Sequence, residues 1–131
     1  MSVPAIHEDD VERLGLPGRE LRWVVGSGAL QAEQCSACVI RVAAGDKVRP
    51  AHSHPNGDEV IYIISGSGRV MVGGEVQAVK AGTTVLFPRG VVHMLHNTGS
   101  EEMKVVCFFA PATNLDNYRM YEDVDFPESA R

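Results

Sequence analysis

The sequence has few cysteines, few basic residues and no long apolar run, and each shortage excludes a class of protein. Its three cysteines are an odd and sparse set, which excludes the disulfide framework of a small secreted domain. No stretch approaches the roughly 18 apolar residues of a membrane-spanning helix, and no apolar segment follows a basic start at the amino terminus. With 12 basic against 17 acidic residues, the chain lacks the basic face of a nucleic-acid-binding protein. We therefore expect no nucleic-acid partner, no membrane partner and a cytoplasmic location.

What the chain does contain is enough apolar sequence for one domain. It has 131 residues, of which 44% are hydrophobic and 22% are charged. A chain of this length buries roughly two-thirds of the surface that it exposes when unfolded, which is enough for one core. The 13 glycines and seven prolines favour short strands and tight turns over long helices.

Short β-prone segments alternate with turn residues along most of the sequence, and this pattern predicts an all-β sandwich or barrel. The predicted strands are about eight in number and lie within residues 21–26, 34–45, 59–66, 69–72, 75–80, 83–87, 91–97 and 103–111. We divide the chain into an amino-terminal arm (1–20), a β domain (21–111) and a polar carboxy-terminal tail (112–131) that carries three aromatic residues. The tail is either loose or packed over a barrel mouth or a neighbouring subunit.

Two histidines are spaced so that they can bind one ion together. His52 and His54 are two residues apart on a segment that reads as a strand, so both side chains point to the same face. An acidic residue follows the turn after them. Both Asp58 and Glu59 are near enough, and the apolar run that begins there does not choose between them.

Glycines and a proline surround these histidines, and a third histidine, at regular spacings. From Gly45 the chain has six residues, His52-x-His54, four residues, Glu59, six residues and Gly66. From Gly82 it has five residues, Pro88, one residue, Gly90, two residues, His93, three residues and Asn97. These segments resemble the paired motifs of the cupin family. The second matches at every fixed position, and the first has one extra residue between Gly45 and His52.

The resemblance implies a double-stranded β-helix, or jelly-roll, barrel with one divalent transition-metal ion inside. The implied ligands are His52, His54, Glu59 and His93, and Glu59 rather than Asp58 is the acid six residues before the closing glycine. Three imidazoles and one carboxylate suit iron, manganese, nickel or zinc. Such a set leaves a coordination position open on an octahedral ion, as metal-assisted chemistry requires.

Several other residues are weighed as ligands or as pocket residues. His96 has the opposite parity to His93 and should face away from the ion, and His7 lies in the polar arm. If Cys35 and Cys38 lie in one strand, their side chains point to opposite faces. The two residues are then about 10 Å apart, which is too far for a disulfide. Cys107 should face the interior, in the core or in the pocket.

Four further side chains are pocket candidates. Trp23, Tyr62, Arg41 and Arg69 lie on predicted strands, and the sequence leaves the orientation of the two arginines open. An arginine inside the barrel would be a ready anchor for a carboxylate. Asn97 is predicted to cap the turn that follows it.

The resemblance implies a small metalloenzyme that binds an oxygen-rich small molecule. The ion would act as the oxygen-activating centre of a dioxygenase or as a Lewis acid, with Glu59 as ligand and candidate catalytic base. The alternatives are a metal-dependent isomerase, decarboxylase or lyase, and a non-catalytic module that binds a small molecule. We also expect a homodimer, because open jelly rolls leave strand edges that need cover and segment 21–26 could cross to a partner.

Overall fold

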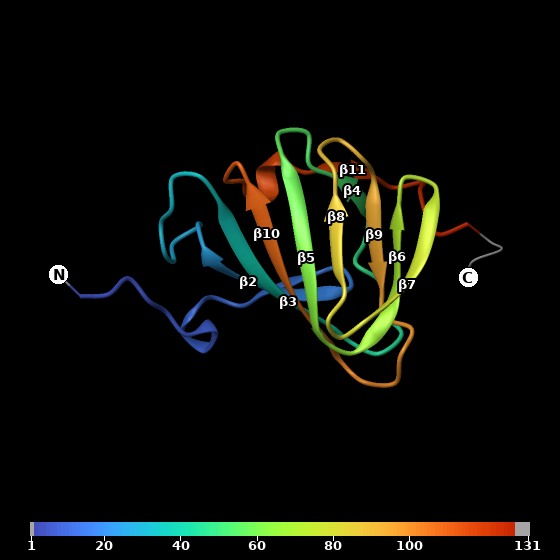
Figure 1. The fold of residues 1–131 in the computed structure, drawn as a ribbon, viewed down its shortest axis with the longest axis horizontal. Coiled ribbons are helices and arrows are strands. Elements are labelled where there is room, and N and C mark those ends of the chain that lie inside the picture. The colour runs from blue at the N-terminus through green and yellow to red at the C-terminus, as the bar shows by residue number, and fades with distance from the viewer. Residues whose placement is uncertain (1, 128–131) are drawn as a thin grey trace.

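In the computed structural model, which describes residues 2–127, two antiparallel β-sheets pack face to face (Figure 1). The six-stranded sheet has the order β1-β2-β3-β10-β5-β8, and the five-stranded sheet has the order β11-β4-β9-β6-β7. The strands are β1 (Leu14–Leu16), β2 (Arg19–Val25), β3 (Ser36–Val42), β4 (Ala51–Ser53), β5 (Asp58–Ser65), β6 (Ser67–Val72), β7 (Glu75–Lys80), β8 (Thr84–Phe87), β9 (His93–His96), β10 (Met103–Ala110) and β11 (Arg119–Tyr121). Two short 3₁₀ helices, η1 (Glu8–Asp10) and η2 (Leu115–Asn117), lie near the ends of the described chain.

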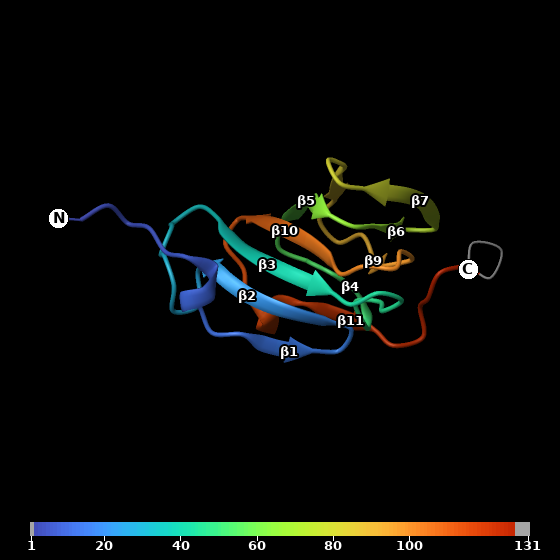
Figure 2. The ribbon, with the colours of Figure 1, turned by 90° about the horizontal axis from the view of Figure 1, so that it is seen from below.

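The prediction of an all-β jelly roll is confirmed, and each of the predicted segments contains a strand. The strand expected around His52 is β4. Sequence patterns did not show β1 and β11, each only three residues long. Figure 2 shows β1 beside β2 at the edge of its sheet. Because β1 and the start of β2 precede residue 21, the sheets begin inside the predicted arm. Among the described residues, no helix is long and apolar enough to cross a membrane.

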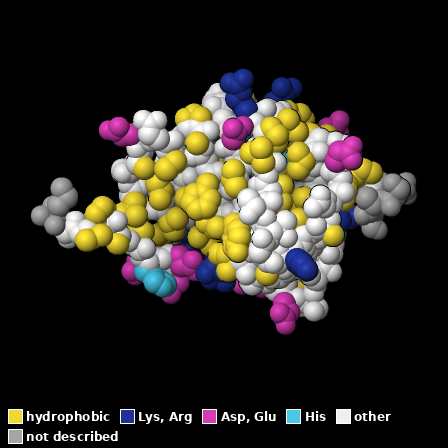
Figure 3. All heavy atoms as spheres, in the orientation of Figure 1, with side chains coloured by type: hydrophobic (Ala, Val, Ile, Leu, Met, Phe, Trp, Pro, Cys, Tyr) yellow, Lys and Arg dark blue, Asp and Glu magenta, His cyan; other side chains and the backbone are white. Residues whose placement is uncertain are grey.

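Alternation of buried and exposed side chains explains why these segments form strands around one core. On β10, Met103, Val105, Cys107 and Phe109 are buried, whereas the residues between them are half-buried or exposed. The main core lies between the sheets, where Trp23 packs against Phe109 with ring centroids 5.5 Å apart. The outer face of the six-stranded sheet carries the exposed apolar side chains of Tyr62, Ile64, Leu86 and Phe108 (Figure 3).

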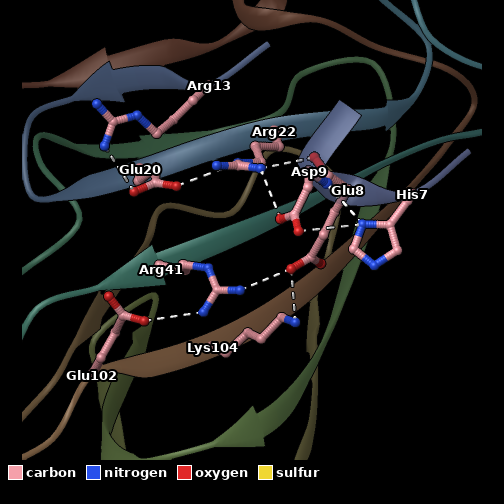
Figure 4. Close-up of polar contacts among 9 residues, drawn as sticks. All are labelled: His7, Glu8, Asp9, Arg13, Glu20, Arg22, Arg41, Glu102 and Lys104. Carbon is pink, nitrogen blue, oxygen red and sulfur yellow. Dashed lines mark hydrogen bonds and ion pairs between the residues drawn. The ribbon is translucent and has the colours of Figure 1, made fainter. Parts of the chain in front are cut away.

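The amino-terminal segment is held against the outer face of the six-stranded sheet by ion pairs (Figure 4). The carboxylate of Glu8 lies 2.8 Å from Arg41 Nη2 and 2.9 Å from Lys104 Nζ. Arg22 Nη1 donates to the backbone carbonyl of Glu8 at 2.9 Å. Arg41 therefore points away from the barrel interior, because β3 turns its side chain to the outer face.

The carboxy-terminal segment covers the five-stranded sheet. Strand β11 pairs with β4, with Met120 opposite His52. Farther along, Phe126 is buried against Met71 and Met94, which lie on the outer face of this sheet. The described part of the tail is therefore packed rather than loose, and Phe126 packs on the outer face of this sheet rather than over a barrel mouth or a neighbouring subunit. Residues 128–131 of the predicted tail lie outside the described residues.

Candidate metal centre

The four implied ligands meet in the interior, and they come from both sheets. His52 on β4 and His93 on β9 are directly paired in the five-stranded sheet, and His54 follows β4. Glu59 lies on β5 of the six-stranded sheet. One ligand atom from each of the four lies within 4.8 Å of the others. All four side chains are buried, with relative exposures between 3% and 6%.

The turn between β4 and β5 selects Glu59 over Asp58. At Gly57 an added Cβ would lie 2.5 Å from the carbonyl oxygen of Ala110, so the turn packs closely under β10 only without a side chain there. Asp58 is exposed, and its Oδ1 accepts a hydrogen bond from the backbone N–H of Arg89 at 2.8 Å. Because neighbouring residues of a strand face opposite sides, Glu59 is the acid that points inward.

Two backbone carbonyls set the tautomers of two histidines. Nδ1 of His52 lies 3.1 Å from the carbonyl oxygen of Pro50, and Nδ1 of His93 lies 3.2 Å from that of Val91. A neutral ring that donates its Nδ1–H in this way carries its lone pair on Nε2. Metal-binding histidines are usually oriented by such hydrogen bonds.

Burial and neighbouring charges set the ionisation of the cluster. Burial, together with the nearby His93, lowers the pKa of His52 to about 3, so its imidazole is neutral at neutral pH. Burial opposes ionisation of Glu59. The adjacent imidazoles of His54 and His93 outweigh it and hold the pKa of Glu59 well below its ordinary value. The cluster therefore contains the neutral imidazole of His52 and the ionised carboxylate of Glu59, which are the protonation states that metal binding needs.

Two features of the cluster indicate that a cation fits between its members. Nε2 of His93 lies 3.2 Å from Oε1 of Glu59 but is buried without a hydrogen bond, and a cation between the two atoms would satisfy both. Nε2 of His54 lies 2.8 Å from the same oxygen. Nitrogen and oxygen ligands about 2.1 Å from an ion, at right angles to each other, are about 3 Å apart. The residues present thus fit a divalent transition-metal ion.

The ligands border a small cavity between the sheets. Its volume is about 30 Å³, and its lining includes His52, Glu59 and His93. Most of the other walls are apolar, from Leu21, Ile40, Val48, Ile61, Phe87, Leu95 and Phe109. Cys38 and Cys107 also line the cavity and are cross-strand partners on β3 and β10. Cys107 is therefore both a core residue and a pocket residue, and both thiols are free.

Tyr118 covers the histidines, and sequence analysis did not identify it as a site residue. Its ring stacks on His52 with centroids 4.8 Å apart and an interplanar angle of 16°, and meets His54 edge-on at 4.3 Å. Burial raises the pKa of Tyr118 well above its ordinary value, so its hydroxyl stays protonated. The aromatic residues of the polar tail were the available signal.

Arg19 also lines the cavity, and no sequence signal pointed to it. It is the first residue of β2, just before the first predicted strand. Burial lowers the pKa of Arg19, yet arginine starts so high that the guanidinium keeps its charge.

The remaining candidates lie outside the cavity. Nε of Arg69 donates to Nδ1 of His96 at 3.0 Å, and its guanidinium lies 4.2 Å from the ring centroid of Phe126. His96 therefore faces away from the cluster, as its parity predicts. Tyr62 is 44% exposed on the outer face of its sheet. Asn97 is fully buried and accepts from the backbone N–H of Gly99 at 2.9 Å, which confirms its capping role.

The motifs that carry the clustered side chains correspond to a known family. Residues 38–109, more than half of the chain, match the family model of the cupin domain. The chain belongs to the cupin family. The four clustered side chains of this cupin lie within the matched region, whereas Arg19 and Tyr118 lie outside it.

Curated relatives match this cupin over about half of its length. A germin-like protein of Oryza sativa subsp. japonica is 34% identical over 67 residues, which are 47% of this chain and 30% of the relative. An oxalate oxidase of Triticum aestivum is 34% identical over 68 residues, 46% of this chain and 30% of the relative. A protein of Streptomyces coelicolor is 39% identical over 54 residues, 41% of this chain and 50% of the relative. The chain thus spans half or less of the length of these relatives.

Solved structures resemble this cupin over nearly its whole length. Streptomyces PAC13 with uridine has a TM-score of 0.77 at 19% identity and covers 99% of this chain and 98% of its own. A double-stranded β-helix protein of Klebsiella pneumoniae has a TM-score of 0.73 at 24% identity, covering 93% of this chain and 100% of its own. A predicted oxalate decarboxylase of Thermotoga maritima has a TM-score of 0.72 at 18% identity, and the match covers 82% of this chain and 98% of its own. At these identities the likeness shows the fold.

Proposed function

We propose that this cupin is a mononuclear metal-dependent enzyme that acts on a small oxygen-rich molecule, with oxygen-dependent oxidation as its first candidate reaction. The observation that carries the proposal is the convergence of three imidazoles and one ionised carboxylate beside a small, mostly apolar cavity. If these buried polar groups had only a structural role, Nε2 of His93 would stay beside Glu59 without a hydrogen bond. Leaving a buried polar atom without a partner costs stability.

Each side chain has a distinct task in the proposed enzyme. His52, His54 and His93 would hold the ion, together with Glu59. A bound divalent ion supplies Lewis acidity, and a redox-active one also supplies reactivity toward oxygen. Glu59 is ionised and could take a proton from a substrate in the cavity, while the Tyr118 ring shields the histidines from water.

Relatives with named activities support the choice of a small oxygen-rich substrate. One is named an oxalate oxidase, and one structural neighbour is described as a predicted oxalate decarboxylase. Another neighbour, Pac13, is described as a nucleoside dehydratase. A non-oxidative isomerase, decarboxylase or lyase is therefore the second candidate, because an ionised Glu59 can move a proton with a redox-inert ion as well.

Metal analysis followed by turnover assays tests the proposal. The protein, purified without a histidine tag, is loaded separately with Fe²⁺, Mn²⁺, Ni²⁺ and Zn²⁺, and its bound metal is measured. We expect about one ion per chain. Oxygen uptake is then recorded with diketones, flavonols and hydroxy acids, and product formation is followed without oxygen.

The outcomes separate the candidates. Substrate-dependent oxygen uptake supports the oxygenase, and anaerobic turnover supports the non-oxidative enzyme. Ligand-induced thermal stabilisation without turnover would leave a binding module, and a protein that takes up no ion would refute the metal-dependent proposal altogether.

A further inference from the structure

Arg19 brings a positive charge to the cavity without a carboxylate partner. Its Nη1 donates to the backbone carbonyls of Pro17 at 3.2 Å and Arg49 at 3.1 Å. Its Nε is buried without a hydrogen bond, and no carboxylate of the described residues lies within ion-pair distance. Arg19 is half-buried, and a partly buried charge without an ionic partner favours an anion beside it.

The hydrogen bonds of Arg19 leave one edge of the guanidinium available. Because the two carbonyls engage Nη1, the edge formed by Nε and Nη2 has no partner among the described residues. Two parallel N–H groups on such an edge match the two oxygens of a carboxylate. The fixed Nη1 also holds the plane of the guanidinium, which reduces the entropy lost on binding.

The charges of the cavity favour an anionic ligand, and this step rests on the proposed metal site. Glu59 contributes one negative charge, whereas Arg19 and a divalent ion contribute three positive charges, so the loaded cavity carries a net charge of about +2. The surrounding walls are apolar and screen little of this charge. An organic anion reduces this excess and a neutral molecule does not.

The dimensions of the cavity restrict the anion to a short one. The free volume is about 30 Å³, and the Tyr118 ring closes the site above His52 and His54. We infer that Arg19 is the specificity-determining residue of this site and that it binds the carboxylate of a short organic acid next to the metal ligands. Arg19 lies outside residues 38–109, which match the family model, so the acid specificity would come from the segment that precedes this region.

Calorimetric titration with a matched pair of small molecules tests this inference. Glycolate and glycolamide have the same size and the same hydroxyl group, and only glycolate carries a carboxylate. We expect the metal-loaded protein to bind glycolate at least about tenfold more tightly than glycolamide, since hydrogen bonds between two charged groups are stronger than those to a neutral group. Arg19→Gln should remove this preference, and Arg19→Lys should restore part of it.

Controls separate binding from folding. Arg13→Gln removes an exposed positive charge that has no contact with Arg19 or the cavity, and it should leave glycolate affinity unchanged. Bound-metal stoichiometry and circular dichroism establish that each variant keeps its ion and its fold. Equal glycolate binding by wild type and Arg19→Gln, with the ion present in both, overturns the inference and leaves the metal proposal intact.

A protein without an ion gives a different result. The metal proposal then fails, and the same titration of the metal-free chain decides the role of Arg19. Glycolate binding that depends on Arg19 supports the inference, and binding that is absent or independent of Arg19 overturns it.

Discussion

At the scale of single residues, the metal centre depends on backbone carbonyls as well as on side chains. The carbonyls of Pro50 and Val91 orient the rings of His52 and His93, and Nε2 of His93 lies 3.2 Å from Glu59. His96, only three residues after His93, belongs to a different environment because its parity turns it toward Arg69. Spacing along the strand therefore separates a ligand from a structural histidine of the same type.

Replacing His93 with alanine should abolish stoichiometric metal binding. Removing a group that hydrogen-bonds to a metal ligand already weakens metal binding about 10–100-fold. Removing the ligand itself should therefore weaken it by more than about 100-fold. Competition with a chromogenic chelator measures the affinity. His96→Ala, on the same strand, is the matched control and should keep its ion. Retention of one ion by His93→Ala would contradict the ligand assignment.

The metal-free protein should lose stability as the pH falls below about 6.5. The pKa of His52 is about 3 in the folded protein, against about 6.5 for an unperturbed histidine. The unfolded chain therefore takes up a proton that the folded protein does not. As the pH falls between these two values, protonation of His52 in the unfolded chain should lower the free energy of unfolding by up to about 1.4 kcal/mol per pH unit.

Urea unfolding at pH 7, 6 and 5 measures this slope on chelator-treated protein. The slope should be shallower for His52→Gln. His7 is an exposed residue of the amino-terminal segment, so His7→Gln should leave the slope unchanged. An identical slope for wild type and His52→Gln would show that His52 does not carry the effect.

At the scale of elements, the carboxy-terminal segment links the outer face of the five-stranded sheet to the metal centre. Phe126 anchors it in the outer apolar cluster, and β11 pairs with the strand that carries His52. Tyr118 precedes β11 directly, so this pairing sets where its ring lies over the imidazoles. An element of three residues thus positions the cover of the site.

Truncating the anchor of this segment should destabilise the protein. Phe126 is only 1% exposed, so Phe126→Ala should lower the free energy of unfolding by about 3 kcal/mol through lost contacts and a new cavity. Phe108 is 49% exposed, and Phe108→Ala should change it by less than about 0.5 kcal/mol. Urea denaturation of the two variants compares them directly. Equal effects would mean that the segment is not anchored by Phe126.

At the scale of the whole molecule, the candidate metal ligands come from both sheets. His52 and His93 belong to the five-stranded sheet, and Glu59 belongs to the six-stranded one. An ion held by all of them joins the sheets across the core. Metal binding should therefore stabilise the domain as one cooperative unit.

Chelation should lower the melting temperature of the whole domain. A free metal concentration 100 times the Kd adds about 2.7 kcal/mol to the free energy of unfolding, which corresponds to roughly 10 °C in Tm for a chain of this size. Scanning calorimetry with and without chelator measures the shift, and His93→Ala should show none. If the wild-type Tm stays the same with added metal and with chelator, no bound ion joins the sheets.

The sequence by itself determined that the fold is all-β and that Cys107 faces inward, and its resemblance to the cupin motifs implied the ligand set. These features depend on local rules, because alternation along a strand and glycine at a tight turn act over a few residues. Only the tertiary structure showed that Arg19 and Tyr118 border the cavity and that Arg41 points outward. It also showed that the free cysteines Cys38 and Cys107 lie opposite each other on neighbouring strands. These placements depend on which distant segments lie side by side. The three-residue strands β1 and β11 are too short to show a pattern of their own, because their pairing partners specify them.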